Sequence, residues 1–141
     1  MTMTYVRSNG GKNMKNYNLK ELENTNKAIT YNRKEVNKIY ELNKDYLKEM
    51  VKEEIKKGNN KGDNFSSFAI ETINKRFPNL TLKTTYKGTM IDNGKIAYRD
   101  KYTETCGIGA ELGKSILMEM TNNKEIIETE TENDEFEYTL P

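Results

Sequence analysis

The sequence predicts an α+β protein with one domain. Three observations carry this prediction. Apolar residues recur every three or four positions between residues 33 and 57, a period of two begins at Asn79, and Asn93 and Gly94 separate two strand-like segments. The chain has 141 residues, enough for one ordinary domain and too few for two independent cores. We therefore expect N-terminal amphipathic helices and then a hairpin, a helix and a second hairpin, whose antiparallel sheet is covered on one face by helices.

The first part of the chain is polar. Residues 1–17 include two adjacent glycines and several Asn and Ser side chains, which predicts a flexible arm. The single α+β domain would then occupy residues 18–141. Its helical part is expected over about 18–77 and its sheet part over about 79–141.

Two helices are expected to begin at capping boxes. Asn18 with Glu21, and Asn32 with Glu35, have the spacing at which side chains cap the free N–H groups of a helix start. The second box opens the clearest expected element, an amphipathic helix over residues 33–57. Its apolar stripe consists of Val36, Ile39, Tyr40, Tyr46, Leu47, Met50, Val51 and Ile55.

The stripe of this helix is interrupted at Asn43. Two interpretations stay open: Asn43 lies at the edge of the stripe and faces water, or it is buried and sets the register of a helix pair. Only 34% of the residues are hydrophobic, so the core is expected to be modest. We therefore expect the helix over residues 33–57 to support a homo-oligomer.

A further helix is expected over residues 65–77. Asp63 or Asn64 would cap its start, and Pro78 would end it. The connection from the preceding helix has about seven residues, whereas a helix-turn-helix motif has three or four. This difference argues against a DNA-reading helix pair.

Two strands are expected on either side of Asn93 and Gly94, because this dipeptide favours a two-residue hairpin loop. The predicted cross-strand pairs are Asp92 with Lys95, Ile91 with Ile96, Thr89 with Tyr98, and Lys87 with Asp100. Opposite charges and apolar residues would then face each other, which supports this register.

Residues 106–115 form a glycine-rich segment in front of another expected helix. A phosphate-binding loop has a glycine, four further residues and then Gly-Lys-Ser, but Ile108 stands where the first glycine is needed. A dinucleotide-binding turn is excluded as well, because Leu112 replaces its third glycine. We interpret the segment as a strand-to-helix turn in which Gly109 and Gly113 allow close packing. Whether this turn also binds an anion stays open.

The C-terminal segment predicts a second hairpin, with a turn at Asn133 and Asp134. The charge balance is +9 over residues 1–101 and −8 over residues 102–141. Whether these two halves bind each other or separate partners stays open. Seven carboxylates are expected to form one solvated acidic face that binds a partner: Glu125, Glu128, Glu130, Glu132, Asp134, Glu135 and Glu137.

The first hairpin has the opposite charge. Its Lys and Arg residues alternate with Tyr, a mixture suited to phosphate contacts and to stacking on bases. The candidate nucleic-acid-binding or nucleotide-binding residues are Lys83, Tyr86, Lys87, Tyr98, Arg99, Lys101 and Tyr102, with Lys114 and Ser115 from the following helix.

The composition argues against an enzyme. The chain has no histidine, the usual general base near neutral pH, and one cysteine, Cys106. We therefore expect no catalytic residues and no cofactor. We also expect no metal site, because the acidic residues lie along strands on which carboxylates do not converge. The first residues of the sequence lack the apolar central block typical of a signal peptide, and no apolar run approaches the roughly 20 residues that span a bilayer. We therefore expect a cytoplasmic protein that does not contact membranes.

Three functional hypotheses follow. The first is a small non-catalytic binding protein from a phage or mobile element, which acts stoichiometrically on a protein partner. Its acidic face would imitate nucleic acid and inhibit a nucleic-acid-handling defence system, as an anti-CRISPR-like protein would. The first alternative is a nucleic-acid-binding accessory factor that uses the basic, Tyr-rich hairpin. The second alternative is a protein that sequesters a small nucleotide.

Overall fold

The computed structural model describes the backbone of residues 5–7 and 14–141, and the side chains of residues 15–86, 93–94 and 103–141. This part of the chain contains both helices and strands, and most of the paired strands are antiparallel, which confirms the predicted α+β class. The elements are β1 (Tyr5–Arg7), β2 (Met14–Asn16), α1 (Leu19–Leu22), β3 (Ile29–Tyr31), α2 (Arg33–Leu42), α3 (Lys44–Lys56), β4 (Lys61–Gly62), α4 (Ser67–Arg76), β5 (Leu80–Asp92), β6 (Lys95–Gly107), α5 (Gly109–Asn122), β7 (Ile127–Glu130) and β8 (Phe136–Thr139).

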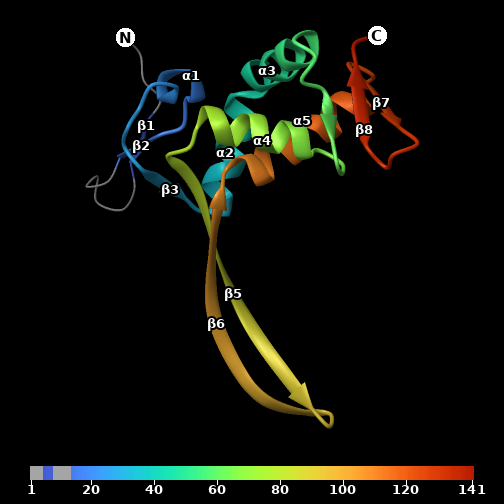
Figure 1. Cartoon of the computed structure of the whole chain (residues 1–141). Helices are drawn as coiled ribbons and strands as arrows, with labels where there is room; N and C mark the ends of the chain where they lie inside the picture. Colours follow the sequence, from blue (N-terminus) through green and yellow to red (C-terminus); the bar gives the residue numbers. More distant parts are fainter. Residues whose placement is uncertain (1–4, 8–13) are drawn as a thin grey trace.

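The elements form a body with one long extension (Figure 1). Helices α2 to α5 make up the centre of the body, with the β1–β2 pair at one end and the β7–β8 hairpin at the other. Strands β5 and β6 leave the body together as a ribbon. No helix in the described part of the chain combines the length and the apolar composition that a bilayer crossing requires.

The two predicted hairpins both form, but they belong to different sheets. Strands β5 and β6 join β3, which runs parallel to β5, whereas β7 and β8 join β4. The expected single antiparallel sheet is therefore wrong. The reason is α5, which has 14 residues and carries the chain about 21 Å along the body before the second hairpin begins.

The core lies between the helices and the base of β5. Helix α5 buries one whole side against α4, and Leu80 and Leu82 of β5 close the core below them. The largest fully buried side chains are Tyr31, Tyr138, Leu19, Ile39, Leu47, Met50, Ile73, Leu80, Ile108, Leu112, Ile116 and Leu117.

The helix expected over residues 33–57 is broken into α2 and α3 at Asn43. This side chain is buried, so the water-facing interpretation is wrong. Its Oδ1 accepts a hydrogen bond from the N–H of Leu19, and its Nδ2 donates to the carbonyl oxygens of Tyr17 and Ile39. The hydrogen bonds of Asn43 thus link the N-terminal segment to the helices, and this side chain does not set the register of a helix pair.

The apolar stripe of α2 and α3 packs within the same chain. Val36, Ile39, Leu47 and Met50 are all buried in the core, and Leu42 is the large apolar residue of these helices that lies exposed. Most of the stripe is therefore covered within the chain, and a homo-oligomer through residues 33–57 stays a prediction.

The predicted arm lies partly outside the described residues, because residues 1–4 and 8–13 are not among them. The described segments Tyr5–Arg7 and Met14–Asn16 pair as antiparallel strands. Tyr17 is buried and its hydroxyl donates to Glu35, 2.8 Å away. The end of the predicted arm is thus tied to α2.

Both predicted capping boxes place a helix start correctly. Asn18 accepts a hydrogen bond from the N–H of Glu21, and Asn32 and Glu35 form a reciprocal box. The predicted cap of α4 at Asp63 or Asn64 is wrong. Helix α4 instead follows Ser66, which has a left-handed backbone, makes no side-chain cap and donates its N–H to the hydroxyl of Tyr138. The start of α4 is therefore in contact with a residue distant in sequence.

Candidate nucleic-acid interface

The ribbon of β5 and β6 leaves the core soon after it begins. Strand β3 pairs with Leu80–Leu82 and ends there. From Lys83 to Asp92, β5 pairs with β6 alone within the described part of the chain. At about 3.3 Å per residue, this two-stranded section is roughly 30 Å long. A protruding element of this length reaches well beyond the body (Figure 1).

The tip of the ribbon is the predicted two-residue loop. Asn93 and Gly94 have φ angles of 50° and 79°, as a tight hairpin turn of the mirror-image type requires. Asp92 pairs with Lys95, and Ile91 pairs with Ile96, as the sequence predicts.

Below the tip the register differs from the prediction. The pairing shifts between Met90 and Ile91, because Ile91 pairs with Ile96 while Met90 pairs with Tyr98. Ala97 is therefore an extra residue in β6, which is a β-bulge. The predicted pairs of Thr89 with Tyr98 and Lys87 with Asp100 are consequently wrong. The structure pairs Thr89 with Arg99, Gly88 with Asp100, and Lys87 with Lys101.

This shift sorts the residues of the ribbon between its two faces. Directly paired residues share a face, and faces alternate along each strand. The described side chains at the base identify the faces: the hydroxyl oxygens of Thr85 and Thr103 lie 3.4 Å apart, Lys83 is exposed, and Leu82 on the opposite face is buried.

The register assigns a set of positions to each face. One face, called here the basic face, comprises Lys83, Thr85, Lys87, Thr89, Ile91, Ile96, Arg99, Lys101, Thr103 and Thr105. The other, called the tyrosine face, comprises Thr84, Tyr86, Gly88, Met90, Asp92, Lys95, Tyr98, Asp100, Tyr102 and Glu104. The basic face thus holds four cationic residues and no acidic residue. All three acidic residues of the ribbon are at positions of the tyrosine face.

Five of the side chains that the sequence nominates for nucleic-acid binding lie outside the described part. They are those of Lys87, Tyr98, Arg99, Lys101 and Tyr102. Their backbone positions separate the cations from the tyrosines, whereas the sequence suggested one interleaved surface. The bulge causes this difference. Without it, Lys87 would lie opposite Asp100 and the charges would largely pair.

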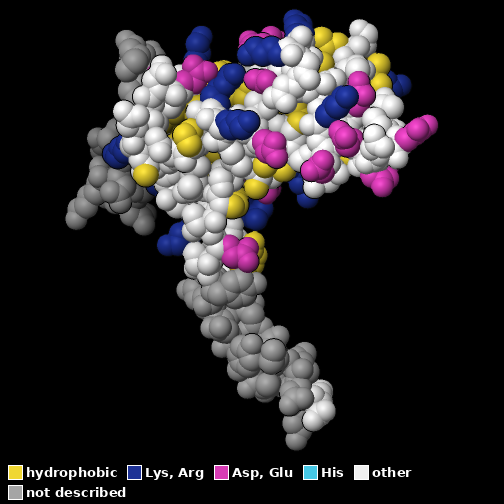
Figure 2. Space-filling view, viewed as in Figure 1, with side chains coloured by type: hydrophobic (Ala, Val, Ile, Leu, Met, Phe, Trp, Pro, Cys, Tyr) yellow, Lys and Arg dark blue, Asp and Glu magenta, His cyan; other side chains and the backbone are white. Residues whose placement is uncertain are grey.

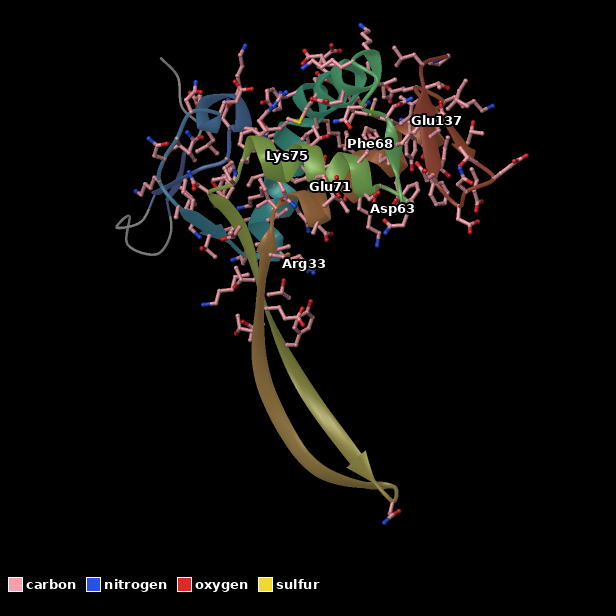
Figure 3. The ribbon with its side chains drawn as sticks, in the orientation of Figure 1. Arg33, Asp63, Phe68, Glu71, Lys75 and Glu137 are labelled. Atoms are coloured by element: carbon pink, nitrogen blue, oxygen red, sulfur yellow. The ribbon has the colours of Figure 1, made fainter. Side chains whose placement is uncertain are left out.

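The base of the ribbon has one cation that the sequence did not nominate. Arg33, at the start of α2, lies where the ribbon leaves the body (Figure 3). Its guanidinium lies 3.0 Å from the carboxylate of Glu111. The charge of Glu111 raises the pKa of Arg33 above its ordinary value, and a hydrogen bond with Tyr86 adds to this shift. This contact anchors the ribbon to both α2 and α5.

Most of the N–H groups in the glycine-rich turn before α5 have partners within the fold. The N–H of Ile108 donates to Leu80, and that of Gly109 donates to Oδ1 of Asn74 at 2.8 Å. The N–H groups of Glu111 and Leu112 bond the carbonyl oxygen of Ile108. Lys114 is exposed and Ser115 is half-buried on α5, away from these donors in sequence. The turn therefore supplies no cradle for a nucleotide.

The glycines of this turn have a packing role, as the sequence suggested. A Cβ atom on Gly113 would lie 2.7 Å from the backbone nitrogen of Ile70 in α4. Backbone atoms cannot yield as a flexible side chain would, so only glycine allows α4 and α5 to approach this closely. The close approach brings Asn74 of α4 onto the start of α5.

The acidic hairpin does not present all its carboxylates on one face. Glu128 pairs with Tyr138 and Glu130 with Phe136, whereas Glu137 pairs with Thr129 on the opposite face. Tyr138 is fully buried and its hydroxyl donates to Glu128, 3.0 Å away. Burial raises the pKa of Tyr138 well above its ordinary value, and Glu128 adds to the shift.

The acidic and basic parts of the chain meet in one ion-pair network. Lys44 lies 3.0 Å from Glu119, and Lys48 lies 3.2 Å from Glu119 and 3.0 Å from Glu125. Hydrogen bonds from the two lysines, Lys44 first, lower the pKa of Glu119. The network joins α3 to α5 and to the segment before β7, so part of the charge division is neutralised within the fold.

Among the described residues, no group of three or more acidic, Cys or His side chains is placed to hold a metal ion. Comparison with protein-family models, with curated proteins and with solved structures finds no match to this chain. The ribbon is the candidate site, because its register separates the positions of four cationic residues from those of its three acidic residues.

Proposed function

We propose that the chain is a non-catalytic nucleic-acid-binding protein that uses the basic face of the ribbon. One observation carries the proposal: the bulge places Lys83, Lys87, Arg99 and Lys101 on one face with no acidic residue among them. Phosphate contacts supply most of the non-specific affinity of nucleic-acid-binding proteins, and they come from cations and hydroxyl groups. The threonine residues between these cations are suitable hydroxyl donors.

The cationic pairing is unfavourable in the free protein. Lys87 and Lys101 are directly opposite each other, a position at which like charges destabilise a sheet. A polyanion at this face removes the repulsion. The ribbon is therefore better suited to a bound state than to isolation in water.

A double helix is the nucleic acid that fits the shape of the ribbon. The major groove of duplex DNA is wide enough to admit a two-stranded β-ribbon. Because the ribbon extends roughly 30 Å past its pairing with β3, it can enter a groove without a collision between the body and the backbone.

The test measures duplex binding by fluorescence anisotropy as a function of salt. Four phosphate contacts predict a slope of about −3.6 in a plot of log K against log salt. The variant carrying Lys87→Glu and Arg99→Glu should lose at least about tenfold in affinity and roughly half of this slope. The observation that would defeat the proposal is a slope near zero for the unaltered protein.

A matched control keeps the net charge of that variant. Lys38 on α2 and Lys56 on α3 are exposed and lie outside the ribbon. Lys38→Glu with Lys56→Glu should retain most of the affinity, because these residues change only the long-range field. An equal loss in both variants would assign binding to net charge instead of the basic face.

A second candidate function is favoured by the acidic end of the body. Glu130, Glu132 and Asp134 are exposed, and none forms an ion pair within the described part of the chain. Acidic side chains gather at this end, far from the ribbon (Figure 2). We propose it as a surface for a basic groove on a nucleic-acid-handling partner, as an inhibitor from a phage would need.

The variants that test this second candidate must not destabilise the β7–β8 hairpin. Glu128 accepts a hydrogen bond from buried Tyr138, so its replacement would also destabilise the hairpin. Glu130→Lys with Glu132→Lys reverses two exposed charges without that contact. Loss of binding to a purified basic partner, with duplex binding unchanged, supports the candidate; unchanged binding to that partner contradicts it.

A further inference from the structure

The outer side of helix α2 has an apolar groove next to an exposed leucine. We propose that two copies of the chain associate through this side, with their α2 helices antiparallel about a two-fold axis and Leu42 of each copy in the groove of the other. The inference does not rest on nucleic-acid binding, because the groove contains no residue of the ribbon.

The groove has a volume of about 580 Å³. Most of its lining comes from long side chains of α2, whose methylene stems can cover an apolar surface while their charged ends stay in water. The lining residues are Tyr17, Lys34, Asn37, Lys38, Glu41 and Leu42.

This side of α2 is turned away from the core. Val36 and Ile39 are fully buried on the other side of the helix, whereas the five groove residues that belong to α2 are all exposed. Leu42 has 59% of its surface exposed, although it is a large apolar residue. One helix side therefore holds both an apolar side chain without cover and a groove that can receive it, as a self-complementary interface requires.

The spacing of the groove residues matches a hole in helix packing. Lys34, Asn37, Lys38 and Glu41 are at positions i, i+3, i+4 and i+7 of one helix. Four residues with this spacing surround one side chain of a facing helix. A two-fold axis that sets Leu42 of one copy opposite Asn37 of the other fills this hole, and the symmetry repeats the contact.

The same axis brings opposite charges together. With Leu42 opposite Asn37, Lys38 of each copy is opposite Glu41 of the other, so the dimer gains two ion pairs. Lys38 forms no ion pair with another residue of the described part. Glu41 lies 3.5 Å from Lys44 but keeps 69% of its side chain exposed, so it is accessible to a second copy.

The parallel arrangement of the two helices is disfavoured. It would set Lys38 against Lys38 and Glu41 against Glu41, and like charges at facing positions repel. Helix α2 also begins where the ribbon leaves the body (Figure 3). The antiparallel arrangement therefore sets the two ribbons at opposite ends of the helix pair.

The first experiment measures the dimer dissociation constant by sedimentation equilibrium, without nucleic acid. One pair of ten-residue helices is a small interface, so the measurement extends to about 1 mM protein. Leu42→Ala should raise the constant at least about tenfold, because both apolar anchors are lost. Ile127→Ala is the matched control and should leave it unchanged, since Ile127 is also exposed but lies on β7.

A charge exchange tests the register. Lys38→Glu should raise the dissociation constant by roughly tenfold, because two ion pairs become two repulsions. Adding Glu41→Lys to the same chain should restore it. Lys56→Glu, which makes the same charge change at an exposed lysine of α3, should have no effect.

Two results overturn the proposal. One is a chain that stays monomeric at every concentration, and the other is a dimer whose dissociation constant Leu42→Ala leaves unchanged. Circular dichroism of each variant establishes that it is folded, since the substituted side chains are exposed.

The outcome is distinguishable from that of the proposed function. Each ribbon would bind through its own basic face, so a short duplex that holds one ribbon is bound equally by monomer and dimer. The effect of Lys38→Glu on association therefore leaves its use as a control for duplex binding valid. A monomer that binds duplex with the expected salt slope removes only the dimer, and a dimer that responds to these substitutions without affinity for duplex removes only the proposed function.

Discussion

The two hairpins of this protein have the same local design and opposite relations to the body. Strands β7 and β8 are four residues long and lie against the helices, whereas β5 and β6 are thirteen residues long and are anchored only at one end. Tyr138 of β8 is fully buried, its ring lies 4.9 Å from that of Phe68, and its backbone exchanges hydrogen bonds with Asn60. Among the described side chains of β5, Leu80 and Leu82 are buried in the core, and Tyr86 contacts Arg33 of α2.

This comparison shows that an alternating strand pattern does not determine whether a face of the hairpin is buried. Alternation divides a hairpin into two faces, but the position of the hairpin on the body decides whether a face is buried. In β7–β8 one face supplies Tyr138 to the core. In β5–β6 the strands continue past the body beyond Leu82, so this section adds no residue to the described core.

The largest expected effect follows from the buried face of β8. Tyr138→Ala should lower the free energy of unfolding by about 3–5 kcal/mol, because a fully buried aromatic side chain leaves a cavity between β8 and Phe68. Urea denaturation followed by circular dichroism measures this loss. Tyr138→Phe is the control and should cost less, about 2 kcal/mol, since it keeps the ring and removes the hydrogen bonds that the hydroxyl donates to Glu128 and accepts from the N–H of Ser66. A loss below about 1 kcal/mol for the alanine variant would mean that β8 is not anchored in the core.

A smaller effect is expected from the ion pairs that hold the segment before β7. The pKa of Glu119 is lower in the folded protein than its ordinary value of 4.5. The folded state therefore binds this proton less readily, and the stabilisation by Glu119 is present above about pH 4.5 and declines as the pH falls through the lowered pKa.

The measurement compares unfolding free energies at pH 6 and pH 3 for the unaltered protein and for Glu119→Gln. The unaltered protein should lose more stability on acidification, by at most about 1 kcal/mol, because the side chain is about a quarter exposed. An identical loss in both proteins would contradict a contribution of this carboxylate to the anchoring of β7–β8.

The smallest effect is expected where the ribbon is removed. Residues 86–102 can be replaced by Asn-Gly, which joins the directly paired Thr85 and Thr103 through a two-residue hairpin loop. The free energy of unfolding should change by no more than about 1 kcal/mol, because the removed section adds no residue to the described core. Thermal unfolding at low protein concentration measures the change. A body that no longer folds would show that the ribbon is part of the core after all.

Several features were predictable from the sequence because each depends on a few neighbouring residues. The boxes at Asn18 and Asn32 and the turn at Asn93 and Gly94 are examples in which a side chain or a backbone preference acts within three or four residues. The α+β class followed from the change of period along the chain. The failure of the phosphate-loop spacing also correctly directed attention to the packing role of Gly113.

Other features depend on contacts between distant segments. Asn43 breaks the long helix because the backbone of Tyr17 and Leu19 needs its amide, and Ser66 starts α4 beside the hydroxyl of Tyr138. No pattern within either helix contains these partners. The separation of the two hairpins into different sheets likewise results from the packing of α5 on α4.

The register of the ribbon depends both on neighbouring residues and on contacts between distant segments. The pairing at the tip was predictable from neighbouring residues, because Asn93 and Gly94 place Asp92 opposite Lys95. The pairing at the base was not, because it depends on the burial of Leu82, opposite Cys106, against distant segments. These two registers differ by one residue, and Ala97 absorbs the difference as a bulge. The charge-segregated faces exist because a local turn and a distant core impose incompatible pairings on the same two strands.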